Sequence, residues 1–413
     1  MPARVVVAVN GPGELMGWAR PFVRSFYALD ADARVTIVFV PCPYATGREP
    51  GAAQALFPRA TIVTHKQYAR FLMGRQVEGM ERGPGALQYL GGDLYHARTI
   101  AKRVGLRAMT YKFSRRAYAH SFVRFFAVDE ANGRELRATG APADAVHVVG
   151  NLVSDAVLDS LASPPAPHSP GDSICVFPGS RPPELRALLP FFLDAALQTA
   201  RATPGMSVSV SVSPFSSDEQ IAQSLRAPDP AFGGVRGELV DGGRTIVAEG
   251  VRVAVDRSGS YDALARAALV IATPGTKCVE AAVLGRALLV VVPFNKLDEA
   301  VLPGLGGYLH RVPIVGKPLK RWLAMSFERR FKHMAQPNID AGKPLVPELR
   351  GVLTPADIAA RARAMLADRT ALRAMGDELS QLYARDAGAS KRMAREALAV
   401  ALEAARPAAG AAS

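Results

Sequence analysis

Residues 4–17 read RVVVAVNGPGELMG, and this stretch decides the fold class. The valine-rich run from Arg4 to Val9 is typical of a strand that is buried on both faces of a parallel sheet. Asn10 to Gly17 supplies a glycine-rich turn, and Ala19 to Leu29 has the spacing of an amphipathic helix. A strand, a glycine turn and a helix in this order predict the start of an open α/β sheet.

The alternation continues in two blocks that are separated by a change of composition. Residues 161–172 are rich in Pro and Ser and suit neither a helix nor a central strand. We predict a Rossmann-like domain over 1–160, a linker over 161–172, a second Rossmann-like domain over 173–355 and C-terminal helices over 356–413. The fold class is therefore α/β, with two doubly wound lobes and a ligand cleft expected between them. The predicted strands are Val5–Val9, Val35–Val40, Phe125–Val128, Val146–Val149, Ile174–Phe177, Val208–Val212, Leu269–Ala272 and Leu288–Val292, with helices over Tyr95–Val104 and from about Pro183.

Composition excludes several classes of protein. The 413 residues are 49% hydrophobic and 21% charged, as in a folded globular chain. Three cysteines are too few and too scattered for a disulfide framework, which favours a reducing compartment. We find no signal peptide and no apolar run of the roughly 18 residues that a spanning helix needs. These features predict a cytoplasmic protein.

Positive charge predicts an anionic partner. Lys and Arg number 50 against 37 acids, a net charge of +13. Positive charge is concentrated among aromatic residues over 111–126 and 317–332. In the second segment, Trp322, Met325 and Phe327 together with Lys320, Arg321, Arg329 and Arg330 suit a helix lying in an anionic membrane interface. A core-facing helix with a solvated basic side is the other interpretation. No nucleic-acid-binding signature is visible, so no nucleic-acid partner is expected. The predicted membrane contacts, on the inner face of the cell membrane, are Lys320, Arg321, Trp322 and Phe327.

Two glycine turns of the second block have the character of phosphate-binding loops. Residues 177–184 read FPGSRPPE, where Gly179 and Ser180 offer donors and Arg181 a planar fork for phosphate oxygens. Residues 272–286 read ATPGTKCVEAAVLGR, a donor-rich turn followed by a helix. Glu280, one turn into that helix, suits a ribose hydroxyl. The alternative is an acid that only complements the helix dipole.

Two corners of the first block place acids after strands. Glu14 follows the first strand between Gly13 and Gly17, and Asp93 follows Gly91-Gly92. The glycine spacing of the first corner is not that of a dinucleotide-binding fold. A solvated glutamate in a plain turn and a helix N-cap aspartate are the other interpretations of these two acids.

Taken together, these segments resemble lipid-A-disaccharide synthase, a family of GT-B glycosyltransferases. The resemblance covers most of the chain in order, although each segment alone is a weak signal. Its pieces here are Gly13-Glu14-x-x-Gly17, Val149-Gly-Asn-Leu-Val-Ser-Asp155, Phe177-Pro-Gly-Ser-Arg181 with Glu184, Leu188-Leu-Pro-Phe-Phe192, Thr273 to Gly285, Gln336-Pro-Asn-Ile-Asp-Ala-Gly342 and Val346-Pro-Glu-Leu349.

The resemblance implies a metal-free, inverting transfer of a glucosamine-type sugar from a UDP-sugar to a lipid-linked sugar acceptor. No cofactor is implied, because the UDP-sugar is a substrate. The family pattern assigns Glu14 and Asp93 as candidate bases and Gly13 and Gly17 to an acceptor-side loop. It assigns the nucleotide-sugar site to Gly179, Ser180, Arg181, Thr273, Gly275, Thr276, Glu280, Asn338 and Glu348.

Departures from the family pattern keep other functions open. Trp18 stands where the family has an aspartate, and residues 272–276 read Ala-Thr-Pro-Gly-Thr where the family has Ser-Gly-Thr. UDP-N-acetylglucosamine epimerases and peptidoglycan-type N-acetylglucosaminyltransferases share the bilobal fold and the Glu-Ala-x-x-x-Gly helix. A UDP-sugar-binding protein without catalysis is a further alternative.

Overall fold

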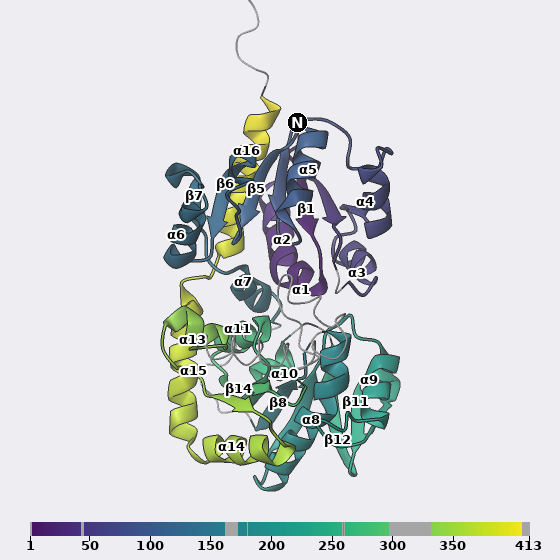
Figure 1. Cartoon of the computed structure of the whole chain (residues 1–413), viewed down its shortest axis with the longest axis vertical. Helices are drawn as coiled ribbons and strands as arrows, with labels where there is room; N and C mark the ends of the chain where they lie inside the picture. Colours follow the sequence, from purple (N-terminus) through teal and green to yellow (C-terminus); the bar gives the residue numbers. More distant parts are fainter. Residues whose placement is uncertain are drawn as a thin grey trace, which may run out of the picture. The chain divides into compact units, whose positions relative to one another are not determined.

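The computed structural model describes residues 2–42, 45–161, 172–179, 181–257, 259, 261–296 and 332–406. The chain divides into two compact units, each built around its own sheet (Figure 1). Unit 1 comprises Met1–Asp159 and Tyr383–Ser413, and unit 2 comprises Ser160–Leu382. The predicted ligand cleft between two lobes stays a prediction.

Unit 1 contains a seven-stranded parallel sheet in the order β3-β2-β1-β4-β5-β6-β7. This is the Rossmann strand order, in which the connections run in opposite directions on the two sides of the β1/β4 boundary. Val5 to Val9 of β1 are fully buried, as the valine run predicts. The strands are β1 (Arg4–Val9), β2 (Arg34–Phe39), β3 (Thr61–Val63), β4 (Ala86–Tyr89), β5 (Arg107–Tyr111), β6 (Phe122–Ala127) and β7 (Val146–Val148).

Helices cover the unit-1 sheet and connect its strands. Several begin at side-chain caps, including Thr64 and Asp93, whose oxygens accept hydrogen bonds from first-turn amides. The helices are α1 (Pro12–Glu14), the π-helical η1 (Leu15–Ala19), α2 (Arg20–Leu29), α3 (Glu49–Leu56), α4 (His65–Leu72), α5 (Leu94–Val104), the short η2 (Ala119–Ser121), α6 (Glu130–Ala138), the short η3 (Ala143–Ala145), α7 (Leu152–Leu158) and α16 (Ala389–Ala405).

The predicted loop over Asn10 to Gly17 is wrong, because helical structure begins at Pro12 rather than at Ala19. Gly13 and Gly17 therefore lie in helical turns. Pro12 occupies the first helical position, where its missing N–H costs nothing. Gly17 is buried against Val153, and apolar packing of this kind outweighs the low helix propensity of glycine.

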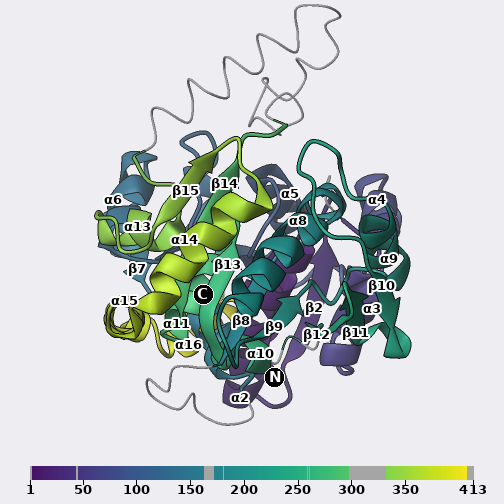
Figure 2. The ribbon, with the colours of Figure 1, turned by 90° about the horizontal axis from the view of Figure 1, so that it is seen from below.

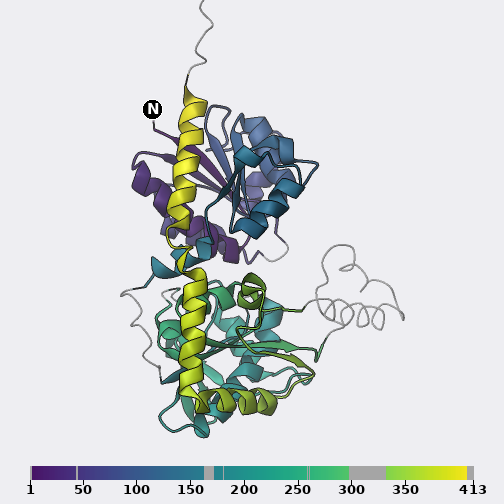
Figure 3. The same ribbon diagram turned by 90° about the vertical axis from the view of Figure 1, so that its left-hand side faces the viewer.

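The C-terminal helices predicted over 356–413 are divided between the two units. Residues up to Leu382 belong to unit 2, whereas α16 returns to unit 1 and lies along its sheet (Figure 3). Asp155 holds the start of α16, since its carboxylate accepts hydrogen bonds from Gly388 N at 2.7 Å and from Ser390 N at 2.6 Å. The buried face of α16 consists of small and apolar side chains: Ala389, Met393, Ala394, Ala397, Val400 and Ala401.

Unit 2 contains an eight-stranded sheet in the order β10-β11-β12-β9-β8-β13-β14-β15. From β12 to β15 all pairs are parallel and repeat the Rossmann order, with the reversal between β8 and β13. An antiparallel ribbon of β10 and β11 extends one edge. The strands are β8 (Ser173–Phe177), β9 (Ser207–Ser211), β10 (Glu238–Val240), β11 (Thr245–Ala248), β12 (Val251–Asp256), β13 (Ala267–Ala272), β14 (Ala287–Pro293) and β15 (Glu348–Gly351).

One face of the unit-2 sheet is covered by α8 and α14, which pack against each other over β8 and β13 (Figure 2). Phe191, Phe192 and Leu189 of α8 are fully buried in this core. None of the helices in the described part of the chain has the length and apolar character to cross a membrane. The helices of unit 2 are α8 (Pro182–Arg201), α9 (Asp218–Arg226), the short η4 (Asp241–Gly243), α10 (Asp262–Ala265), α11 (Thr276–Val283), α13 (Gln336–Ala341), α14 (Pro355–Ala367) and α15 (Arg369–Ala384), whose last residues pass into unit 1.

Candidate functional site

The strand-order reversal of unit 2 brings two of the predicted phosphate-binding loops to one edge of the sheet. Phe177 ends β8 and Ala272 ends β13, and the two residues are register partners in neighbouring parallel strands. The loops that carry Gly179 and Gly275 therefore leave the sheet side by side. In open α/β sheets, ligands bind at the carboxyl edge where the strand order reverses.

The β8–α8 loop requires glycine and orients a cation. Gly179 has a φ of +98°, and a Cβ there would meet the Cβ of Glu184 at 2.7 Å. The Glu184 carboxylate accepts a 2.9 Å hydrogen bond from Arg181 Nη1. Pro182 and Pro183 occupy the first turn of α8 and have no N–H to donate. In the described part of this loop, Arg181 is therefore the candidate for contact with an anion.

The β13–α11 loop leaves a helix N-terminus open. Gly275 is the N-cap of α11 and has no side chain with which to cap this helix. Gly275 and Thr276 are exposed. The Cys278 thiol donates a hydrogen bond to the backbone carbonyl of Thr273 at 3.3 Å. Unpaired first-turn N–H groups attract anions, and the partial positive charge of the helix end adds to the attraction.

Glu280 lies in the second turn of α11 and is 6% exposed. Because α11 has no acid in its first turn, Glu280 is not placed to complement the helix dipole, as the alternative interpretation required. Its Oε2 accepts a 2.7 Å ion-pair hydrogen bond from Lys277 Nζ. A buried carboxylate is thereby matched by a cation one turn earlier on the same helix.

Lys277 belongs to the candidate site through its contact with Glu280, and the sequence analysis did not select it. Its ammonium lies 5.1 Å from the ring centroid of Phe177 and 5.7 Å from that of Tyr261. Burial opposes the charge, but Glu280 and the other nearby groups outweigh it and raise the pKa of Lys277 above its ordinary value. The available signal was its position three residues before Glu280 on one helix face.

Asn338 and Glu348 form a buried hydrogen-bonded pair. Asn338 Nδ2 donates to Glu348 Oε1 at 2.8 Å, and the carboxylate also accepts from Met334 N and Ala335 N. Burial raises the pKa of Glu348, but these donors and Arg350 outweigh it and hold the pKa below its ordinary value. Asn338 makes two further bonds with the backbone of Val346. This geometry fixes residues 334–348, next to α11.

The reversal in unit 1 lies between β1 and β4, where Ala8 and Tyr89 are register partners. A Cβ on Gly91 would meet Asn10 Oδ1 at 2.4 Å and Glu14 Cγ at 2.9 Å, so glycine is required for the two corners to approach. Glu14 therefore lies directly against the turn that leads to Asp93. Burial, together with the charges of Asp93 and Glu14, raises the pKa of Tyr89.

Asp93 has two structural contacts. Its Oδ1 caps α5 by accepting from Tyr95 N at 2.8 Å, as the N-cap interpretation predicts, and its Oδ2 lies 3.6 Å from Arg115 Nη1. Trp18, the departure from the family pattern, forms an edge-to-face pair with the buried ring of Tyr111 at 5.5 Å. Its ring thus contributes to the core beside this corner.

Some predicted residues fall outside the described part of the chain. These are Ser180 of the β8–α8 loop and the proposed membrane contacts Lys320, Arg321, Trp322 and Phe327. Within the described residues, no group of three or more His, Cys, Asp or Glu side chains is placed to hold a metal ion. The chain contains one Asp-x-Asp triplet among its described residues, Asp30-Ala31-Asp32, directly after α2. Both oxygens of Asp30 accept backbone hydrogen bonds there, from Ala3 N and from Asp32 N.

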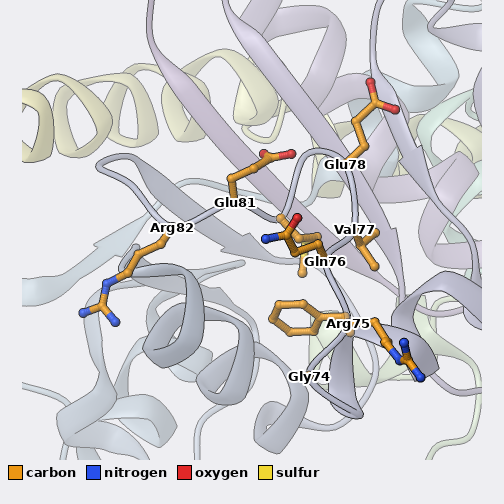
Figure 4. Close-up of a pocket in the computed structure, with 9 residues that line it drawn as sticks. Gly74, Arg75, Gln76, Val77, Glu78, Glu81 and Arg82 are labelled. Atoms are coloured by element: carbon orange, nitrogen blue, oxygen red, sulfur yellow. The ribbon is translucent and has the colours of Figure 1, made fainter.

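A hollow of about 420 Å³ lies between the end of α4 and the start of β4. It is at the amino edge of the unit-1 sheet, and none of the predicted site residues lines it. The side chains of Arg75, Glu78 and Arg82 are exposed and point in different directions (Figure 4). Binding sites present convergent polar groups, so this hollow has little of the character of one.

Over 231 residues the chain is 30% identical to the lipid-A-disaccharide synthase of Anaeromyxobacter dehalogenans strain 2CP-1, and it is equally similar to that of Anaeromyxobacter sp. strain K. The match includes 55% of this chain and 49% of the relative, so the chain spans about half the length of the curated relatives it matches. No family model matches the sequence.

Solved structures resemble the chain over nearly its whole length. MnaA of S. aureus with UDP gives a TM-score of 0.58 at 10% identity, covering 95% of each chain. UDP-GlcNAc 2-epimerase from Neisseria meningitidis, bound to UDP-GlcNAc, gives 0.57 at 13% identity, covering 96% of this chain and 100% of that one. MurG of Acinetobacter baumannii gives 0.50 at 13% identity, covering 96% and 99%. With its two Rossmann-like sheets, the chain has the two-lobe GT-B fold.

Proposed function

We propose that this chain is a glycosyltransferase that moves a glucosamine-type sugar from a UDP-sugar to a lipid-linked sugar acceptor. One observation carries the proposal: the loop with Gly179 and Arg181 and the loop that begins α11 follow register-paired neighbouring strands at the strand-order reversal of unit 2. This arrangement suits a diphosphate, because backbone N–H groups and a guanidinium both favour phosphate oxygens. The sequence similarity to lipid-A-disaccharide synthases supports the sugar class.

In this proposal unit 2 binds the donor. Gly179, Ser180 and Arg181 contact the diphosphate from one loop, and Thr273, Gly275 and Thr276 contact it from the other. Glu280 accepts hydrogen bonds from the ribose hydroxyls. Asn338 and Glu348 act on the same site as positioning residues, because their polar atoms hold the 334–348 segment.

Unit 1 supplies the base in this proposal. An acceptor hydroxyl attacks the anomeric carbon with inversion, the bond between that carbon and the UDP oxygen breaks, and the hydroxyl proton passes to a carboxylate. We assign this role to Glu14, which lies against the Gly91 turn at the strand-order reversal of unit 1. Asp93, the N-cap of α5, is the second candidate. The charge that develops on UDP is met by Arg181 and the α11 N-terminus.

The basic and aromatic residues 317–332 support the proposal of a lipid-linked acceptor, with Lys320, Arg321, Trp322 and Phe327 as contacts of an anionic membrane surface. Flotation with vesicles that contain anionic lipid tests this part separately. Binding that is lost in K320E/R321E supports the proposal, and equal flotation of wild type and variant contradicts it.

The central experiment incubates the purified chain with UDP-sugars and a lipid-linked glucosamine acceptor, and measures release of UDP. UDP release that requires the acceptor supports the proposal, and we expect it to persist in EDTA. Epimerised UDP-sugar without an acceptor, or transfer only to a lipid-linked muramyl sugar, would favour the two other enzyme classes. UDP binding without any turnover would indicate a binding protein.

A further inference from the structure

Lys277 lies at a position where a lysine does not favour the stability of its helix, α11. It is the second residue of α11, where the partial positive charge of the helix end repels a cation. It also precedes Glu280 in the helix, and the lysine-before-glutamate order is the weaker of the two for an i,i+3 or i,i+4 pair. Helix stability alone therefore does not account for lysine at this position.

The surroundings of Lys277 restrain its ammonium in one place. The rings of Phe177 and Tyr261 lie at cation–π distance, and these residues come from two further elements, the end of β8 and the N-cap of α10. The Lys277 side chain is 29% exposed and that of Glu280 is 7% exposed. A cation that is held by two rings has little freedom to leave its carboxylate partner.

The ion pair with Lys277 uses one carboxylate oxygen of Glu280, and the other oxygen is left to accept a hydrogen bond. Lys277 Nζ contacts Oε2, and Glu280 forms no second hydrogen bond with any described residue. Oε1 therefore keeps its capacity to accept from a ligand. A buried carboxylate without its cation would pay a desolvation cost and would be free to rotate or to take up a proton.

We propose that Lys277 is a positioning residue of the donor site, which fixes Glu280 so that its second oxygen accepts a hydrogen bond from a ribose hydroxyl of the nucleotide. This inference rests on the proposed function and adds to it the residue that makes the site selective for a ribonucleotide. Lys277 acts through Glu280 and does not itself contact the nucleotide.

The experiment measures the affinities of UDP, 2′-deoxy-UDP and 3′-deoxy-UDP by calorimetry. Wild type should prefer UDP over at least one deoxy analogue by about tenfold to a hundredfold, the usual range for a hydrogen bond to a charged group. Both Glu280→Gln and Lys277→Met should reduce this ratio to within about threefold of unity. The double variant should resemble the single ones, because both substitutions remove one shared interaction.

Two variants keep the test independent of folding. Lys277→Arg retains the cation and should restore most of the preference, with far-ultraviolet circular dichroism as the check on folding. Lys343→Met removes a lysine from an exposed pair with Glu378 and should leave the ratio unchanged. If Lys277→Met does not fold, the comparison of Lys277→Arg with Glu280→Gln decides: a retained preference in the first and its loss in the second support the inference.

Three results would overturn the inference. The UDP preference could survive in Lys277→Met, or be lost in Lys277→Arg as completely as in Glu280→Gln. Alternatively, Lys277→Met could reduce the ratio of UDP to UMP affinity while sparing the ribose preference, which would place Lys277 against the diphosphate. A wild-type chain that does not bind UDP would instead contradict the proposed function, and the inference would fail with it.

Discussion

The two strand-order reversals have the same architecture and opposite chemistry. In unit 1 the corner after β1 carries Glu14 in the first turn of α1, and Asp93 caps the helix after β4. In unit 2 the helix after β13 has neither an acid in its first turn nor a side-chain cap. Asp93 thus satisfies its own helix end, whereas the N-cap Gly275 has no side chain to cap α11, so first-turn N–H groups are left for an external anion.

In the proposed function, the strand order determines where each site lies and the first helical turn determines what it binds. Both reversals bring two loops together. Gly91 is required where the two corners of unit 1 approach, and Gly179 is required where its own loop turns back against Glu184. Carboxylates suit a proton-transfer role, and cations with open N–H groups suit a leaving diphosphate. Glu14→Gln removes the carboxylate side of this contrast, and Arg181→Ala removes the cationic side.

The largest effect is expected from Glu14→Gln. If Glu14 takes the acceptor proton, its amide should lower kcat at least a hundredfold, within the usual contribution of a general base. UDP affinity should change less than twofold, because Glu14 belongs to the other unit. Turnover is measured by UDP release and affinity by calorimetry.

Two controls sharpen the result for Glu14. Glu130→Gln changes an exposed first-turn acid of α6 and should leave kcat unchanged. Asp93→Asn should lower kcat less than tenfold, since its carboxylate already contacts Tyr95 N and Arg115. A larger loss in Asp93→Asn than in Glu14→Gln would exchange the two roles.

Arg181→Ala tests the cationic side of the contrast. A charge-assisted contact worth about 2 kcal/mol corresponds to a loss of about thirtyfold in UDP affinity. The matched control is Arg226→Ala, an exposed arginine of α9 that pairs with Glu219. An unchanged UDP dissociation constant in Arg181→Ala would remove this residue from the donor site.

The sequence predicts the sheet where strands are apolar and long. β1, β8 and β13 are continuous apolar runs, and the structure confirms each. β4 escapes the pattern because its four residues include Gln88, which is fully buried and donates to Tyr89 O. Hydrophobic periodicity does not detect a strand that is this short and contains a buried polar side chain.

Within the candidate site, local sequence predicts the loops better than their partners. Gly179 and Gly275 follow strands, so adjacency of β8 and β13 brings them together. The sequence does not predict that Lys277 lies beside Phe177, because their proximity depends on sheet register. For the same reason it does not predict that Asp155 holds α16, a contact between residues 235 positions apart in the sequence.

Asp155→Asn tests the contact that attaches the start of α16 to the rest of unit 1. The carboxylate accepts from Gly388 N, Ser390 N and Ser390 Oγ, and an amide would place a donor against these donors. We expect the free energy of unfolding of unit 1 to fall by about 2 kcal/mol. Hydrogen exchange should accelerate in α16 while the protection of unit 2 stays constant. The exposed Asp144→Asn is the control, and slow exchange of α16 in Asp155→Asn would contradict this role.

The smallest effect, and one that depends on pH, is expected from Glu348→Gln. Its donors hold the pKa of Glu348 below its ordinary value of 4.5, so the folded state favours the ionised form. The charge therefore stabilises unit 2 above pH 4.5, and this contribution is lost as the pH falls through the lowered pKa of the folded protein. At pH 7 the variant should be less stable by about 1.5 kcal/mol, and below the folded pKa the difference should approach zero.

Denaturant unfolding of wild type and Glu348→Gln at several pH values measures this difference, and subtraction cancels the other carboxylates. Glu219→Gln is the matched control, because that side chain is 76% exposed and its pair with Arg226 should contribute less than about 1 kcal/mol at any pH. A difference that is constant with pH would show that Glu348 acts through packing alone. The positioning role would then rest on Asn338, whose amide fixes Val346 without any charge.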